Sequence, residues 1–382
     1  MRVRLLESAI IILFLVMMAV TSAHMPKMLM IPSVSHNVDN HTSDDPGDHK
    51  LDYTAMTEKE LMVLAYDGDP YACYRLGVLY DYGANQITQN FSSALEWYRT
   101  ADAYGMSQAA CGIGYLYLNG CGVEQDYEVA RLYFQRAAQL GDPEGYVGLG
   151  RVGLETDGEG SEIFELIKTA KDSGVPDGAY YLGYLYEKGI GTSPRGKKAY
   201  RLYKKTATLD SDDPTDNYAI CASMTRLGIL CMEGIGTKRD YSEALEWFEQ
   251  AADRDYAMAY YYIGIMYEMG YGVSQDYGRA LSYLDQAAQK NYAPALNEIG
   301  CMYFAGRGVD VNFEQAVYYQ KLAAALGYEK AQVNLGYLYE NGYGVQRDLG
   351  IALTYYQMAK DRGYAGAAEA TARVHSLINR DR

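Results

Sequence analysis

Histidine and tryptophan are scarce in this sequence of 382 residues, which contains five histidines and two tryptophans. Four of the histidines lie within residues 24–55, so His375 is the single histidine of the part that we expect to fold. The pattern Ser-x-x-Lys is absent from the chain. Neither a Ser-His nor a Ser-Lys pair can therefore be assembled from known motifs, and we predict a noncatalytic protein.

Positive charge is also in short supply, because 34 lysines and arginines stand against 49 acidic residues and give a net charge of −15. Binding to a nucleic-acid backbone needs clustered lysine and arginine, so we expect no nucleic-acid partner. Residues 191–198 have the glycine and lysine spacing of a phosphate-binding loop, but Lys198 stands where Ser or Thr must hold magnesium. We expect no metal and no small-molecule cofactor.

What the chain does contain is a repeat. Leu-Gly or Ile-Gly recurs in a series of eight, with gaps of 37, 36, 33, 45, 36, 36 and 36 residues, and the glycines of this series define copies one to eight: Gly77, Gly114, Gly150, Gly183, Gly228, Gly264, Gly300 and Gly336. A fixed period in this range is typical of a solenoid, in which each unit buries its apolar face against its neighbours.

Each copy predicts two helices. We number positions from the repeat glycine. The copies share a small residue at −5, Leu or Ile at −1, an apolar residue at +2 and, in six of them, tyrosine at +3. These positions fall on one arc of a first helix, which we expect to be buried. A glycine inside a helix costs about 1 kcal/mol, so its recurrence indicates a close approach by a neighbouring helix. A second glycine six residues on predicts a left-handed C-cap. The second helix follows, with predicted N-caps at Asp126, Asp240, Asp276, Asn312 and Asp348, then an alanine and, three residues later, an aromatic.

The motif Ala-x(4)-Gly-x-Leu-Tyr-x-x-Gly-x-Gly-Val-x-x-Asp, followed by Ala-x-x-Tyr and a small pair, resembles the Sel-one-like repeat, a relative of the tetratricopeptide repeat. The resemblance covers roughly residues 58–363. It implies an all-α fold, a right-handed α-solenoid of about eight helix-turn-helix repeats of about 36 residues. Proteins with such arrays are generally adaptors in multiprotein assemblies, so the resemblance also implies a scaffold for protein–protein interaction.

Two places depart from the pattern. Copy three runs from Gly150 into Thr156 and Gly160 without the usual loop, and an acidic insertion, 210–216, lengthens the gap before copy five. Together they could divide the array into two differently curved halves. Of the six cysteines, five fall on first helices and Cys121 lies in a turn, so we expect mostly free thiols.

The chain ends predict further segments. Residues 1–23 look like a signal peptide, because Arg2 and Arg4 precede twelve apolar residues, 9–20. An uncleaved signal anchor remains open, as does a start at Met56, where Thr57 and Glu60 have capping-box spacing. We expect a flexible linker at 24–56, the repeats at 57–363, and a capping helix and tail at 364–382. The protein would be exported (secreted, periplasmic or in the endoplasmic-reticulum lumen) or membrane-anchored through its N-terminus, and cytoplasmic if it starts at Met56.

A binding face is predicted at positions that vary between copies, because invariant positions serve folding. Offsets −3, +1 and +4 lie away from the buried arc of the first helix, and in solenoids of paired helices the inner helices line a concave groove that takes a peptide or a partner's helix. The predicted binding residues are Tyr74, Val78, Tyr115, Leu118, Arg151, Tyr180, Tyr184, Glu187, Ile229, Tyr261, Ile265, Phe304, Tyr337 and Glu340.

Other interpretations of the sequence remain open. The same fourteen residues could pack on adjacent helices. The chain could be an envelope protein that binds glycan or cell-wall fragments, or, as described for some relatives of the family, a weak β-lactam hydrolase, with acid and base roles taken by paired carboxylates.

Overall fold

A computed structural model describes residues 51–83, 87–209 and 217–380 of the chain. Within these ranges it contains eighteen α-helices and no strand. None of these eighteen helices is both long and apolar enough to span a membrane. The predicted signal or anchor segment, the linker up to residue 50 and the acidic insertion at 210–216 lie outside the described residues.

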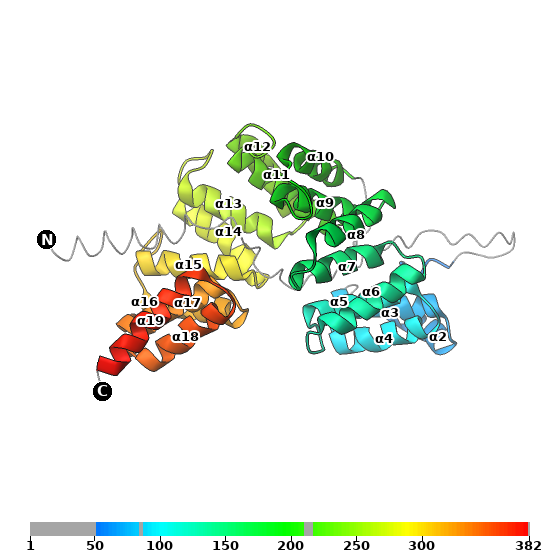
Figure 1. Cartoon of the computed structure of the whole chain (residues 1–382), viewed down its shortest axis with the longest axis horizontal. Helices are drawn as coiled ribbons and strands as arrows, with labels where there is room; N and C mark the ends of the chain where they lie inside the picture. Colours follow the sequence, from blue (N-terminus) through cyan, green and yellow to red (C-terminus); the bar gives the residue numbers. More distant parts are fainter. Residues whose placement is uncertain (1–50, 84–86, 210–216, 381–382) are drawn as a thin grey trace. The chain divides into compact units, whose positions relative to one another are not determined.

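Sixteen of the helices form eight hairpins in chain order, so the predicted all-α repeat architecture is confirmed (Figure 1). The first helices are α3 (Pro70–Tyr82), α5 (Ser107–Asn119), α7 (Glu144–Glu155), α9 (Pro176–Lys188), α11 (Asn217–Glu233), α13 (Ala257–Met269), α15 (Ala293–Ala305) and α17 (Glu329–Asn341). The second helices are α4 (Phe91–Ala103), α6 (Tyr127–Gln139), α8 (Gly160–Asp172), α10 (Gly196–Ala207), α12 (Tyr241–Asp253), α14 (Tyr277–Gln289), α16 (Phe313–Ala325) and α18 (Leu349–Asp361).

A short helix precedes the hairpins and a longer one follows them. Helix α2 (Glu58–Tyr66) begins at the predicted capping box, in which the backbone N–H of Thr57 donates to Glu60 Oε2 at 2.8 Å and the Thr57 hydroxyl oxygen accepts from the backbone N–H of Glu60. Helix α19 (Ala365–Arg380) packs on α18 and contacts α17. It buries Ala367, Thr371 and Val374 and leaves Arg380 exposed, as a terminal helix with one solvated side must.

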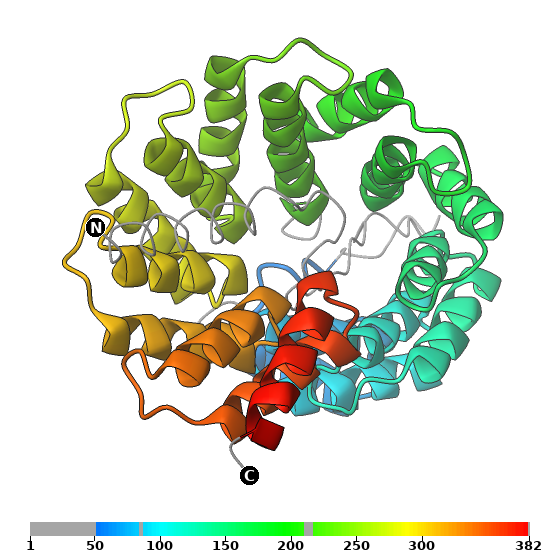
Figure 2. The same ribbon diagram turned by 60° about the vertical axis from the view of Figure 1, so that its left-hand side comes forward.

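The chain divides into two compact units, and the boundary falls between Arg254 and Asp255. Among the described residues, 51–254 form one unit with copies one to five, and 255–380 form the other with copies six to eight. The boundary therefore lies neither in copy three nor at the acidic insertion. Within each unit, every hairpin packs against the next in chain order (Figure 2).

The predicted arc of the first helix is the buried one, and the repeat glycine lies at its centre. A Cβ placed on Gly228 would lie 2.5 Å from Cε1 of Phe248, which is fully buried on α12. The same relation holds between Gly114 and Phe134. In these hairpins the group that approaches the glycine is therefore the ring of a phenylalanine, four residues after the alanine of the second helix. The backbone of the second helix is not the nearest group.

The tyrosines at +3 were expected to be buried, and the structure corrects this to half-buried. Four of the six lie flat against the aromatic side chain three residues after the alanine of their own second helix, with centroids 5.7–6.2 Å apart and ring planes within 19°: Tyr117 on Tyr133, Tyr267 on Tyr283, Tyr303 on Tyr319 and Tyr339 on Tyr355. Stacked rings of this kind hold the two helices of one hairpin together while leaving an edge in water.

The loop signals are confirmed. The second glycine caps the first helix in the left-handed conformation, with φ of 70° at Gly120 and 73° at Gly342. The predicted aspartates and asparagine cap the second helices, as where Asp126 accepts from the backbone N–H of Glu128 and of Val129. Copy three also forms a hairpin, from α7 and α8, although Thr156 replaces the capping glycine at φ −111°.

Candidate functional site

The fourteen predicted binding residues divide evenly by exposure. Seven are buried, at 2–6% exposure: Tyr74, Val78, Tyr115, Leu118, Arg151, Tyr180 and Ile229. Seven are half-buried: Tyr184, Glu187, Tyr261, Ile265, Phe304, Tyr337 and Glu340. All of the buried ones belong to residues 51–254, which we call the first unit. In this unit successive first helices contact one another: α3 with α5, α5 with α7, α7 with α9, and α9 with α11. Packing between neighbouring helices accounts for the positions of these seven.

Some of the predicted residues do meet. The Arg151 guanidinium lies over the Tyr115 ring, 5.0 Å from its centroid, and the Tyr115 hydroxyl donates to Glu144 Oε1 at 2.5 Å. Because Tyr115 is on α5 while Arg151 and Glu144 are on α7, this contact joins the first helices of copies two and three. It is a buried polar contact between two repeats.

The acidic residues at +4 show a pairing within each hairpin. In three of the four hairpins whose first helix carries an acid there, the second helix carries tyrosine opposite the repeat glycine: Tyr98 donates to Asp81 at 3.1 Å, Tyr203 to Glu187 at 3.1 Å and Tyr356 to Glu340 at 2.9 Å. Where +4 is Leu118 or Met232, that residue is phenylalanine, Phe134 or Phe248. In the two other copies with an apolar residue at +4 it is Ile167 or Gln320. The hydroxyl is present where a buried carboxylate needs a donor.

Three of these acids also pair with an arginine that follows 33 to 39 residues later. Arg226 Nε donates to Glu187 Oε2 at 3.1 Å, Arg373 Nη2 to Glu340 Oε2 at 2.7 Å, and Arg307 forms an ion pair with Glu268. Each arginine comes from the next hairpin, or from α19 after the last one. These charged contacts therefore tie neighbouring repeats together.

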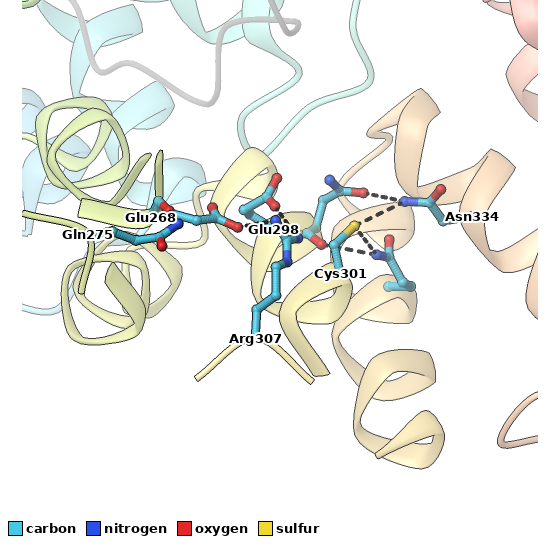
Figure 3. A network of polar contacts seen from close by, with 8 residues as sticks. Glu268, Gln275, Glu298, Cys301, Arg307 and Asn334 are labelled. Carbon is cyan, nitrogen blue, oxygen red and sulfur yellow. Dashed lines mark hydrogen bonds and ion pairs between the residues drawn. The ribbon is translucent and has the colours of Figure 1, made fainter. Parts of the chain in front are cut away.

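Copy six departs from the pairing, and Figure 3 shows the result. Leu284 stands where the other acid-bearing hairpins have tyrosine, so Glu268 receives no hydroxyl donor from its own second helix. Arg307, in the loop after α15, instead contacts both Glu268 and Glu298, the latter at 3.0 Å. The carboxylate side chains are 1% and 3% exposed, and that of Arg307 is 23% exposed. Two buried acids thus share one guanidinium.

This sharing has an electrostatic consequence. Burial, and then repulsion from Glu298, raise the pKa of Glu268 to about 8, against the attraction of Arg307. Beside the charged cluster, Asn334 donates to Asn297 Oδ1 at 2.9 Å, and Gln320 donates to the backbone carbonyl of Asn297 at 3.0 Å. The polar network therefore runs from α13 through α15 to α16 and α17.

Asp81 lacks an arginine in the equivalent place, where the loop holds Cys121 instead. Burial raises the pKa of Asp81 to about 7, although the hydrogen bond from Tyr98 acts in the opposite direction. The folded chain then keeps a proton that the unfolded chain releases above pH about 4. The stability associated with this proton is complete below pH 4 and is lost as the pH rises to 7, at about 1 kcal/mol per pH unit.

Asp81→Asn is therefore expected to flatten the pH dependence of unfolding of residues 51–254 between pH 4 and pH 7 and to stabilise this unit at pH 8, because the amide keeps an acceptor for Tyr98 without a charge. Denaturant unfolding followed by the fluorescence of Trp97 and Trp247, which both lie in this unit, measures the effect. Glu246→Gln, an exposed change on α12, is the control and should leave the slope as it is. An unchanged slope in Asp81→Asn would contradict the assignment.

The cysteine thiols lie inside the fold. All six cysteines are free and buried, and burial raises the pKa of every one of these thiols, for example to about 11 for Cys121. A thiol with a raised pKa is a poor nucleophile at neutral pH. Among the described residues no group of three His, Cys, Asp or Glu side chains is placed to hold a metal ion. The acids at +4 bond to tyrosine and arginine side chains and so link helices within and between hairpins.

A half-buried aromatic cluster is the part of the predicted face best suited to contact another molecule. Phe304 and Tyr337, both predicted, lie 6.2 Å apart between ring centroids. Tyr343, in the loop after α17, lies 5.6 Å from Phe304 and 5.0 Å from Phe313 at the start of α16. We call Phe304, Phe313, Tyr337 and Tyr343 the aromatic cluster. Each of the four is half-buried, and they come from two successive hairpins.

Several residues of these sites escaped the sequence analysis. Arg226, Arg307 and Arg373 lie outside the offsets used to define the binding face, and Phe313 and Tyr343 lie outside the first helices. A signal for the buried acids was present, because tyrosine replaces phenylalanine on the second helix in three of the copies that carry an acid at +4.

The fold and the hairpin chemistry define an α-helical repeat protein of the solenoid class. The Sel1 repeat matches residues 70–101, 107–142, 176–211, 221–256, 257–292, 293–328 and 329–364. The chain therefore belongs to the Sel1 repeat family. The matched segments hold seven of the eight hairpins, and the unmatched one is copy three, in which α7 and α8 form a hairpin without the usual loop.

A crystal structure of a Sel1 repeat protein from Oxalobacter formigenes is similar in fold, with 24% identity, a TM-score of 0.50 and coverage of 83% of this chain and 90% of that one. The structure of c5321, a protective antigen of uropathogenic Escherichia coli with an SLR fold, is 25% identical over 84% of this chain and 68% of that one, with a TM-score of 0.43.

Two curated relatives match over shorter segments. The ERAD-associated E3 ubiquitin-protein ligase component HRD3B of Arabidopsis thaliana is 30% identical over 110 residues, and the chitin synthase regulator SKT5 of Saccharomyces cerevisiae is 29% identical over 143 residues. These segments are 28% and 36% of this chain, and they span only 17% and 20% of the two relatives.

Proposed function

We propose that this chain is a noncatalytic adaptor that binds an extended peptide or a partner's helix across the faces of its first helices, with the aromatic cluster as the anchor. The observation that supports it most directly is the half-burial of Phe304 and Tyr337, which occupy predicted binding positions on successive first helices. Aromatic side chains are enriched at the centres of protein interfaces because they bury a large area at low entropic cost.

The family and its relatives point in the same direction. One curated relative is named as a component of a ubiquitin-ligase assembly and another as a regulator of an enzyme. A repeat array whose buried acids are tied between neighbouring hairpins is a preorganised surface, and preorganisation lowers the entropic cost of binding. The raised pKa values of the thiols favour a scaffold over a cysteine-dependent enzyme.

The test is crosslinking of the full chain in cells, followed by mass spectrometry of the captured partners and of the chain's own first residue. We expect a specific protein whose capture falls at least tenfold in the double variant Phe304→Ala/Tyr337→Ala, because anchors at an interface centre each contribute about 2 kcal/mol or more. Tyr271→Ala is the matched control, since Tyr271 occupies the loop position in copy six that Tyr343 occupies in copy eight.

Two outcomes would contradict the proposal. Capture that is unchanged in the double variant would remove the aromatic cluster from the interface. The absence of any protein above background, together with binding of a soluble glycan that a single tyrosine change abolishes, would favour the glycan-binding alternative.

A further inference from the structure

The second helices carry a surface that the repeat pattern does not explain. Their sixth and tenth residues are exposed or partly exposed, and in five of them both are polar or charged: Glu96 and Thr100, Glu165 and Thr169, Arg201 and Lys205, Glu246 and Gln250, and Ser282 and Gln286. In α16 the same positions hold Tyr318 and Leu322, which are 55% and 38% exposed, and the tenth residue of α18 is Met358, at 41%. The fold requires no apolar side chain at these positions, because five other hairpins do without one. Helix α6 has a single one, Leu132, with Arg136 at its tenth position.

These exposed side chains form two rows. Tyr318, Leu322 and Leu326 are spaced by four residues along α16 and just beyond its end, and Ile351 and Met358 are seven residues apart on α18. Both spacings place the residues on one stripe of a helix. Exposed apolar residues that gather in this way are typical of an interaction site, whereas scattered ones are not.

A shallow groove lies between the two helices. It has a volume of about 360 Å³ and is lined by Lys321, Ala324 and Ala325 of α16 and by Ile351, Thr354, Tyr355 and Met358 of α18. Alanines from α16 and apolar side chains from α18 leave room for side chains from outside. We call this the second-helix groove.

The charge of the groove decides between possible occupants. Of the described residues that line it, Lys321 alone is charged, in a chain whose net charge is −15. The ammonium of Lys321 lies 5.8 Å from the centroid of the Tyr339 ring, which places it beside the groove. A second copy docking face to face would bring its own Lys321 against the first. A helix that carries a carboxylate among its apolar side chains would be attracted instead.

We propose that the second-helix groove is a docking surface for the apolar face of an amphipathic helix from another protein, with a carboxylate of that helix paired to Lys321. Two parallel rows of apolar side chains match the spacing of three, four and seven residues that such a helix presents. None of the four residues of the aromatic cluster lines this groove, so it is separate from the site of the proposed function, and either one can fail without the other.

The experiment uses the full chain and two stapled helical peptides of identical apolar face, one with glutamate and one with lysine at its centre. We expect the glutamate peptide to bind about fivefold more tightly, as for a partly exposed ion pair, and Lys321→Glu to reverse the preference. Leu322→Asp should abolish binding of both peptides, while the matched change Gln286→Asp on α14 should leave it intact. Phe304→Ala/Tyr337→Ala should also leave it intact.

Each other result counts against the proposal. If neither peptide binds, or if the two bind equally and Lys321→Glu has no effect, the groove does not recognise an acidic helix. If sedimentation shows self-association that Leu322→Asp abolishes, the occupant is a second copy of the chain and the assigned partner is wrong.

Discussion

Replacing Arg307 with methionine is expected to destabilise residues 255–380 by about 3–5 kcal/mol at pH 9. The guanidinium is the shared counter-charge of Glu268 and Glu298, whose side chains are 1% and 3% exposed. Without it, both acids remain in a space that water barely reaches, and either of them that stays ionised is an unpaired buried charge, whose cost is one of the largest that a single substitution can expose.

The loss should shrink at pH 5. Glu268 already has a pKa raised to about 8, and removal of a positive neighbour raises it further, so at pH 5 this carboxyl is protonated and one of the two charges is gone. Hydrogen exchange read by mass spectrometry on peptides from 255–380 measures the effect at both pH values. The triple variant Arg307→Met/Glu268→Gln/Glu298→Gln should recover most of the loss.

A matched control is available in the same unit. Arg279→Met breaks an ion pair with Asp276 in which both side chains are well exposed, so its cost should stay below about 1 kcal/mol at either pH. A loss in Arg307→Met as small as that of the control would show that Glu268 and Glu298 do not depend on Arg307.

The hairpins could be predicted because most copies repeat the same local chemistry. A glycine after the first helix, an aspartate or asparagine before the second and small residues between the two act within a few residues of each other. Eight repetitions make such a signal hard to mistake, and even copy three, which lost its capping glycine, forms its hairpin because Ile163 and Ile167 fill the space beside Gly153 and Gly150.

For the binding face, the sequence predicted only the direction in which each side chain leaves its helix, and not its exposure. Offsets on a helical wheel give the angle at which a side chain leaves its helix, whereas exposure depends on how closely the next first helix approaches. In the first unit that approach covers Tyr74, Tyr115 and Tyr180. The pairs made by Arg226, Arg307 and Arg373 could not be predicted either, because each joins a copy to the next hairpin or to α19, whereas a repeat pattern describes only what the copies share.

Phe248→Ala is expected to destabilise residues 51–254 by about 3–5 kcal/mol. The ring is fully buried between α11 and α12, where it fills the space left by Gly228. Its removal leaves a cavity that the two helices can close only in part. Trp247 is the neighbouring residue, so denaturant unfolding followed by tryptophan fluorescence reports on this hairpin directly. Leu132→Ala, at a site 63% exposed on α6, should cost less than about 0.5 kcal/mol.

The pair Gly228 and Phe248 gives a sharper test of why the repeat contains glycine. In the native background Gly228→Ala should cost about 1–3 kcal/mol, because the new methyl group would overlap a ring that has no space to move into. In the Phe248→Ala background the same change should be neutral or stabilising, since the ring is gone and alanine favours the helix by about 1 kcal/mol. A double-mutant cycle must then show strong coupling. Additive effects would mean that the glycine is there for a reason other than the ring it faces.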